Sequence, residues 1–129
     1  MISATLGEIE ESISSSSIVI SSNIQKYFSS TKKEAYIRGN LIFTDLSSLE
    51  FSIYILEREK KTMFDKYRFQ YMDYRKSLIF RYDNAPHHKN ISTSPCHKHL
   101  RDGKVIESTI PKIREILEEI TALITQSTS

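Results

Sequence analysis

Two neighbouring segments decide the fold: AYIRGNLIF at residues 35–43 and LEFSIYI at residues 49–55. Apolar residues occupy every second position through most of both segments, as in a β-strand that buries one face. The connection at residues 45–48 is short and turn-like, so we expect the two segments to pair as an antiparallel hairpin.

The same alternation extends outward on both sides. Residues 18–28, 67–71 and 78–82 also alternate, which brings the predicted number of strands to five. Helical spacing appears at the two ends of the chain, over residues 3–14 and residues 109–125. The apolar face of the last helix comprises Ile110, Ile113, Ile116, Leu117, Ile120, Leu123 and Ile124.

The predicted fold class is therefore α+β, with a five-strand antiparallel meander flanked by an N-terminal and a C-terminal helix on one face. We expect a single domain over residues 1–129, with its strands within residues 18–83. Residues 84–107 show neither period and contain Pro86, Pro95 and Gly103. Such a long irregular connection is typical of a functional loop.

Composition limits the classes of protein to consider. The hydrophobic content is 39%, and no apolar run approaches the roughly 20 residues that span a bilayer. We see no secretory signal at the start, and the single Cys96 fits a reducing compartment. A cytoplasmic protein without a membrane partner is expected.

Charge is concentrated in one part of the chain, although the formal net charge is only +2. Residues 63–104 contain nine lysines and arginines against four acids, and all four histidines lie in the same stretch. Phosphate is the natural partner of such a local positive field.

The histidines (His87, His88, His97 and His99) fall within thirteen residues, near Asp83 and Asn84. In the simplest reading they belong to a solvated polar loop and cap backbone groups. In a second reading, imidazoles act as general acid and base on RNA, which supplies its own 2′-hydroxyl nucleophile. Arg81 and Lys98 would then hold the phosphate, and neither a metal nor a cofactor would be needed.

A third reading makes the histidines and Cys96 ligands of zinc or another late transition metal. Their spacing is not diagnostic, because adjacent His87 and His88 are awkward joint ligands and only Asp83 and Asp102 are nearby carboxylates. We therefore predict no metal site.

One further row of residues is a candidate for binding. Tyr67, Phe69 and Tyr71 could stack on bases, but at least two of them are expected in the core. Arg68 and Gln70 alternate with them and should continue to Arg81 on the next strand. This opposite row is the better candidate for a phosphate-binding face.

Three segments together resemble TumE-type toxins of prokaryotic toxin–antitoxin loci. They are Tyr67-Arg-Phe-Gln-Tyr, Ile79-Phe-Arg-Tyr-Asp-Asn-Ala-Pro-His-His and Ile91-Ser-Thr-Ser-Pro-Cys-His-Lys-His, and the resemblance extends from Tyr67 to Ile120. Lys89 and Cys96 depart from the family pattern, which commonly has proline and histidine there. The shared positions are Arg81, Asp83, Asn84, His87, His88, His97 and His99.

The resemblance implies a growth-inhibiting protein that is neutralised by a cognate antitoxin and acts on RNA. The leading hypothesis is a metal-independent ribonuclease with Asp83, His87, His88, His97 and His99 as catalytic residues. Arg68, Arg81, Asn84 and Lys98 are the predicted substrate-binding residues. The alternative is a non-enzymatic nucleic-acid or partner-binding module, and a homodimer is left open.

Overall fold

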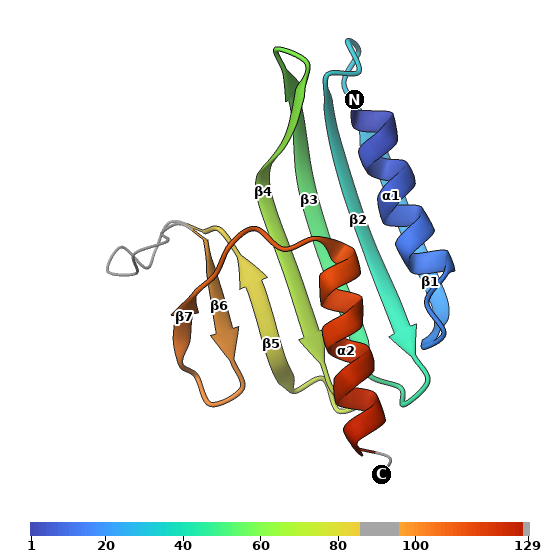
Figure 1. Ribbon diagram of the computed structural model, residues 1–129, viewed down its shortest axis with the longest axis vertical. Coiled ribbons are helices and arrows are strands. Elements are labelled where there is room, and N and C mark those ends of the chain that lie inside the picture. Colours follow the sequence, from blue (N-terminus) through green and yellow to red (C-terminus); the bar gives the residue numbers. More distant parts are fainter. Residues whose placement is uncertain (86–95, 128–129) are drawn as a thin grey trace.

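The computed structural model describes residues 1–85 and 96–127, and over these residues the chain forms two helices and one seven-stranded sheet (Figure 1). Every strand pairs antiparallel with the strand before it in the sequence. The elements are α1 (Ile2–Ser14), β1 (Val19–Phe28), β2 (Glu34–Phe43), β3 (Ser48–Arg58), β4 (Lys61–Met72), β5 (Leu78–Asp83), β6 (His97–Leu100), β7 (Val105–Glu107) and α2 (Ile113–Ser127).

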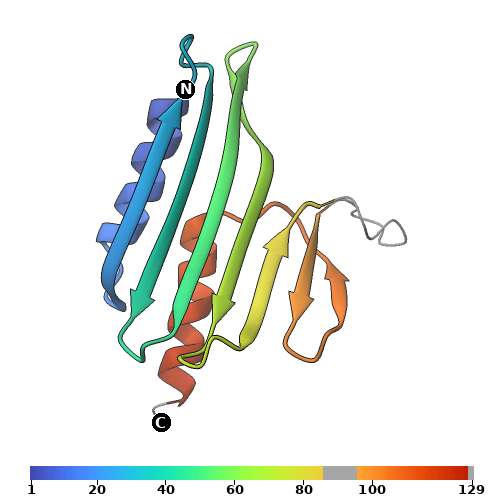
Figure 2. The same cartoon turned by 180° about the vertical axis from the view of Figure 1, so that it is seen from behind.

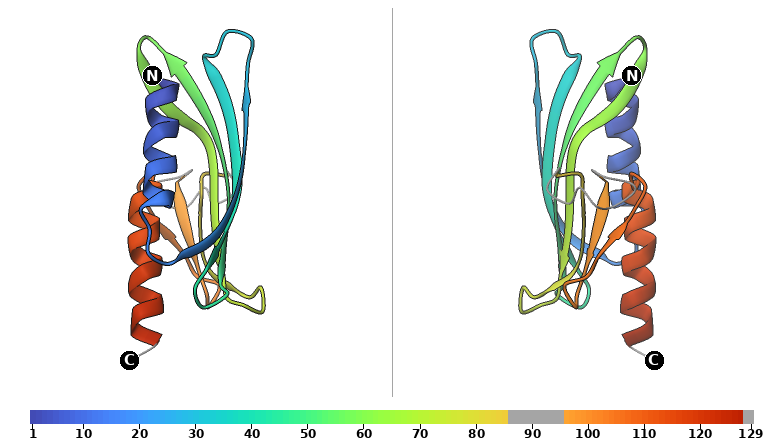
Figure 3. Two further views of the ribbon diagram at one scale, coloured as in Figure 1. Left: turned by 90° about the vertical axis from the view of Figure 1, so that its right-hand side faces the viewer. Right: turned by 90° about the vertical axis from the view of Figure 1, so that its left-hand side faces the viewer.

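Both helices lie on one face of the sheet, as the edge-on views show (Figure 3). We call this the inner face. Figure 2 presents the other face, which neither described helix covers and which we call the open face. The predicted α+β class and the two helices on one face are confirmed.

The hydrophobic core lies between the helices and the inner face. Strands β2 to β5 contribute alternate apolar residues, and each helix contributes one apolar stripe. At Gly39 an added Cβ would lie 2.6 Å from two ring atoms of Phe51, so only glycine leaves room for that ring. The main core residues are Ile2, Leu6, Ile9, Ile13, Ile37, Leu41, Phe43, Leu49, Phe51, Ile53, Ile55, Tyr67, Phe69, Tyr71, Phe80, Ile113, Ile116, Leu117 and Ile120.

The prediction of five strands was wrong, because the described residues form seven. Two short strands, β6 and β7, lie within the predicted functional loop 84–107. Their sequences give no apolar alternation, since His97-Lys-His-Leu100 has three polar residues out of four. The last helix begins at Ile113 rather than near residue 109, and Ile110 and Leu123 are exposed.

Across residues 1–85 and 96–127, neither helix combines the length and hydropathy that crossing a bilayer would require.

We predict that Leu117→Asp lowers the free energy of unfolding by about 3 kcal/mol or more, because it places an unpaired charge in the core. Leu117 is 4% exposed. Leu123→Asp is the matched control on the same helix, since Leu123 is 37% exposed and its replacement should change stability little. Chemical denaturation measures both, and equal stabilities for the two variants would contradict this packing.

Candidate functional site

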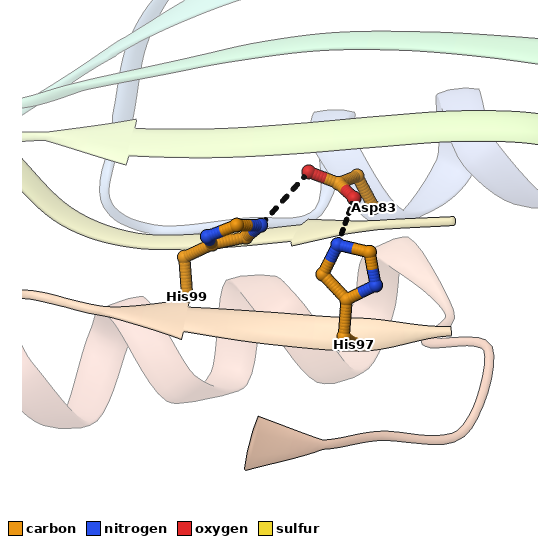
Figure 4. Close-up of side chains that lie close together, drawn as sticks. All are labelled: Asp83, His97 and His99. Carbon is orange, nitrogen blue, oxygen red and sulfur yellow. Dashed lines mark ion pairs between the residues drawn. The ribbon is translucent and has the colours of Figure 1, made fainter. Parts of the chain in front are cut away.

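A buried carboxylate, that of Asp83, forms the centre of the candidate site. Asp83 is the last residue of β5 and is only 5% exposed. Its Oδ1 lies 2.6 Å from Nε2 of His97, and its Oδ2 lies 3.3 Å from Nε2 of His99 (Figure 4). Nε of Arg81 donates a hydrogen bond of 2.9 Å to Oδ2. Arg81, His97 and His99 thus surround Asp83, and all four were predicted as site residues from the sequence.

Strand register brings these four residues together. Arg81 is the cross-strand partner of His99, and Asp83 is the partner of His97. Residues two apart on a strand point to the same face, so all four side chains lie on the open face. The alternation that buries the core therefore also assembles the cluster.

The surroundings of Asp83 compensate for the burial of its charge, which would otherwise be costly. Oδ1 also accepts a hydrogen bond of 3.2 Å from the backbone N–H of Ala85. Two lone pairs 2.6 Å apart would repel each other, so we assign the His97 proton to Nε2, facing Oδ1. Oδ1 thus faces the nitrogens of His97 and Ala85, and Oδ2 faces those of Arg81 and His99.

His99 contacts both charged members of the cluster. Its Nε2 lies 3.2 Å from Nη2 of Arg81, which can only donate, and 3.3 Å from Oδ2 of Asp83, which can only accept when ionised. A bare Nε2 can accept from Arg81, and a protonated Nε2 can donate to Asp83. Both protonation states of this nitrogen therefore have a partner within the cluster.

Exposure separates the residues that a substrate could reach from those that it could not. The His97 side chain is fully buried, whereas those of His99 and Arg81 are 12% and 26% exposed. The two imidazole rings are 4.8 Å apart and nearly perpendicular. His99 and Arg81 are therefore the more accessible members of the cluster, whereas the His97 side chain is closed to solvent.

A pocket of about 570 Å³ opens beside this cluster on the open face. Asp83 and Arg81 form one wall, and Lys66 and Arg68 of β4 form another. The remaining lining residues are Tyr36, Ser52, Tyr54, Tyr67, Asn84 and Ala85. The pocket offers the cations of Lys66, Arg68 and Arg81 to an anionic ligand, and Asp83 connects it to the two imidazoles.

Asp83, His97 and His99 are also residue types that bind late transition metals. Ligand atoms of Asp83, His97 and His99 lie within 4.8 Å of one another, which a metal ion could bridge. However, the guanidinium of Arg81 already contacts Oδ2 and the His99 nitrogen that a metal would use. An ion bound there would face a fixed cation at short range, which Coulomb repulsion disfavours.

Lys98 does not join the cluster, although the sequence places it between two of its members. It is the cross-strand partner of Tyr82 and points to the inner face, where its Nζ donates a 2.7 Å hydrogen bond to Glu119 of α2. Burial alone would lower the pKa of Lys98, but hydrogen bonds with Glu119 and Tyr82 raise the pKa above its ordinary value. Lys98 therefore holds α2 on the sheet.

Asn84 has a backbone-binding role in the structure. Its Oδ1 accepts a 3.0 Å hydrogen bond from the N–H of Tyr67, and its Nδ2 donates one of 2.9 Å to the carbonyl of Asp65. The side chain thus continues the pairing with β4 where β5 ends, and it fixes the position of Asp83.

The other predicted residues fall into two groups. Tyr67, Phe69 and Tyr71 are all buried, which confirms their assignment to the core, while Arg68, Gln70 and Arg81 share the open face as expected. His87 and His88 lie outside the described residues. The sequence interpretation missed Tyr36, Ser52, Tyr54 and Lys66, because before residue 67 it considered only the alternating apolar residues of the strands.

Comparisons with known proteins bear on this site. The family model described as Toxin TumE matches residues 9–127, which is nearly the whole chain and includes every residue of the Asp83 cluster. Comparisons with curated proteins and with solved structures gave no match. The chain belongs to the TumE toxin family.

Proposed function

We propose that this toxin is a metal-independent ribonuclease and that the Asp83 cluster is its active site. The observation that carries the proposal is the position of His99, whose Nε2 lies between the guanidinium of Arg81 and the carboxylate of Asp83. Such an imidazole can exchange a proton near neutral pH, beside a cation that can hold a phosphate.

RNA needs little more than this for cleavage. A base removes the proton of the 2′-hydroxyl, and the O2′ oxygen forms a bond to the adjacent phosphorus. The bond from phosphorus to O5′ breaks, and an acid protonates the leaving oxygen. The products are a 2′,3′-cyclic phosphate and a 5′-hydroxyl, and neither water nor a metal enters the step.

The four residues divide these tasks. His99 exchanges the proton, and Arg81 neutralises the charge that develops on the phosphorane. Asp83 orients His99 through Nε2, and buried His97 holds Asp83, so both are positioning residues. One of His87 and His88, predicted as catalytic from the sequence, would supply the second proton-transfer group.

The second candidate function is a non-enzymatic binding module, and the complete burial of His97 favours it, because a buried imidazole beside a carboxylate can be purely structural. In either case we propose that a cognate antitoxin neutralises the protein.

Product chemistry separates the two candidates. Incubation of the purified protein with RNA should leave 2′,3′-cyclic phosphate and 5′-hydroxyl ends, identified by end-labelling and mass spectrometry. A substrate with 2′-deoxyribose throughout should stay intact. Ends carrying 5′-phosphate would contradict the proposed chemistry, and uncleaved RNA would favour the binding module.

We expect His99→Ala to lower the cleavage rate by about 10²- to 10⁴-fold with little change in RNA affinity. Asp83→Asn should also slow cleavage, because the amide cannot hold both Arg81 and His99 as the carboxylate does. Both variants are measured by cleavage kinetics after their folding is verified by circular dichroism.

Arg81→Ala should also lose activity, and Arg101→Ala is its matched control. Arg101 contacts an aspartate as well, Asp73 at 3.1 Å, but away from the cluster. If His99→Ala or Arg81→Ala cleaved RNA as fast as Arg101→Ala, the assignment would be refuted.

Metal dependence gives a further test. A chelator should leave the cleavage rate and the Tm unchanged, and elemental analysis should find far less than one zinc per chain. Arg81→Ala, in contrast, should bind added zinc more tightly than the parent protein, because it frees the ligand atoms of Asp83 and His99. Stoichiometric zinc in the parent protein, with activity that the chelator abolishes, would overturn the metal-free mechanism.

A further inference from the structure

A row of three tyrosines crosses the open face of the sheet. Tyr27 of β1 pairs with Tyr36 of β2, which pairs with Tyr54 of β3. The rings of Tyr27 and Tyr36 are stacked at 6.1 Å between centroids, and those of Tyr36 and Tyr54 are tilted at 6.4 Å. Tyr27 is 52% exposed. An aromatic row of this kind offers flat apolar surfaces to a ligand.

A second row runs beside the tyrosines and ends at the candidate active site. Following the register from strand to strand, it comprises Gln25, Arg38, Ser52, Arg68, Asp83 and His97. Arg38 and Arg68 are both exposed and lie on either side of Ser52. Lys66 closes the tyrosine row on β4 as the partner of Tyr54. Cations thus accompany the aromatic row toward Asp83.

Two adjoining hollows follow these rows. The pocket beside Asp83 shares Tyr36, Ser52 and Arg68 with a second hollow of about 450 Å³, which reaches Gln25 and Arg38. With strands about 4.8 Å apart, the path from β1 to β5 is about 19 Å long. A short run of nucleotides fits along it.

We propose that the open face binds single-stranded RNA, with unpaired bases stacked on Tyr27, Tyr36 and Tyr54 and phosphates on Arg38, Lys66 and Arg68. This proposal rests on the proposed ribonuclease function, since it directs the strand toward Arg81 and His99. Aromatic side chains beside cations are the usual means of binding single strands without strong sequence preference. In a duplex the bases are already stacked on each other, so the tyrosines would find no partner.

Binding is tested with an oligoribonucleotide of about a dozen nucleotides that carries 2′-O-methyl groups and cannot be cleaved by its own 2′-oxygens. Fluorescence anisotropy should show that Tyr27→Ala and Tyr36→Ala each weaken binding about 5- to 100-fold, as expected for the loss of one stacked base. Tyr36→Phe, which keeps the ring, should bind like the parent protein. Arg38→Gln and Arg68→Gln should each lower the salt dependence of binding.

Tyr74→Ala is the matched control, because Tyr74 is 63% exposed but lies in the turn between β4 and β5. It should leave RNA binding unchanged. If Tyr27→Ala and Tyr36→Ala bind RNA as tightly as Tyr74→Ala, or if duplex RNA binds as tightly as the single strand, the proposal is overturned. Variants that keep RNA binding but lose neutralisation by the antitoxin would also overturn it, since the face would then bind a protein.

This test is independent of catalysis. If RNA binding depends on the tyrosines but unmodified RNA is not cleaved, the proposed RNA-binding face is supported and the proposed ribonuclease activity is refuted. If the tyrosine substitutions do not affect cleavage at subsaturating RNA, the proposed RNA-binding face is refuted and the ribonuclease activity stands.

Discussion

A single sheet has to hide one of its faces from water, and the rest of this molecule follows from how it does so. The pleat sends successive side chains to opposite faces, so covering one face with α1 and α2 leaves the other free for polar chemistry. Residues that belong to different functions therefore alternate along the same strand. On β6, Lys98 binds α2 on the inner face while its neighbours His97 and His99 surround Asp83 on the open face.

This arrangement buries the charge of Asp83 at the end of β5, which costs free energy unless the charge has partners. Arg81, His97, His99 and the N–H of Ala85 together face its two oxygens. Because the carboxylate needs these partners for stability, it also fixes their positions, and a proton-transfer geometry needs that rigidity. Stability thus depends on the same contacts that arrange the candidate site, so variants at Asp83 should be judged by how they fold as well as by their activity.

Sequence reasoning recovered what hydrophobic periodicity encodes and missed what depends on pairing. The first five strands were predictable from alternate apolar residues such as those of 35–43 and 49–55, and the two helices from apolar residues at helical spacing. β6 was not, because its inner face holds Lys98 and Leu100 and its polar residues are paired by tertiary contacts. The hairpin of β3 and β4 also extends to a two-residue turn at Glu59 and Lys60, both with positive φ and without the glycine or asparagine that signals such a turn. Asp83, His97 and His99 were named as site residues from the sequence, although their geometry was not. The tyrosine row depends on the register of three strands, which no local pattern reveals.

The order of the strands also dictates when the site can exist during synthesis. Each strand pairs with the one made just before it, so the sheet can grow strand by strand as the chain leaves the ribosome, with mostly local pairings. Asp83 acquires its imidazole partners only when β6, residues His97–Leu100, has emerged and paired with β5. Nascent chains shorter than this carry the tyrosines and Arg68 but no assembled cluster. The complete Asp83 cluster can therefore form only near the end of translation.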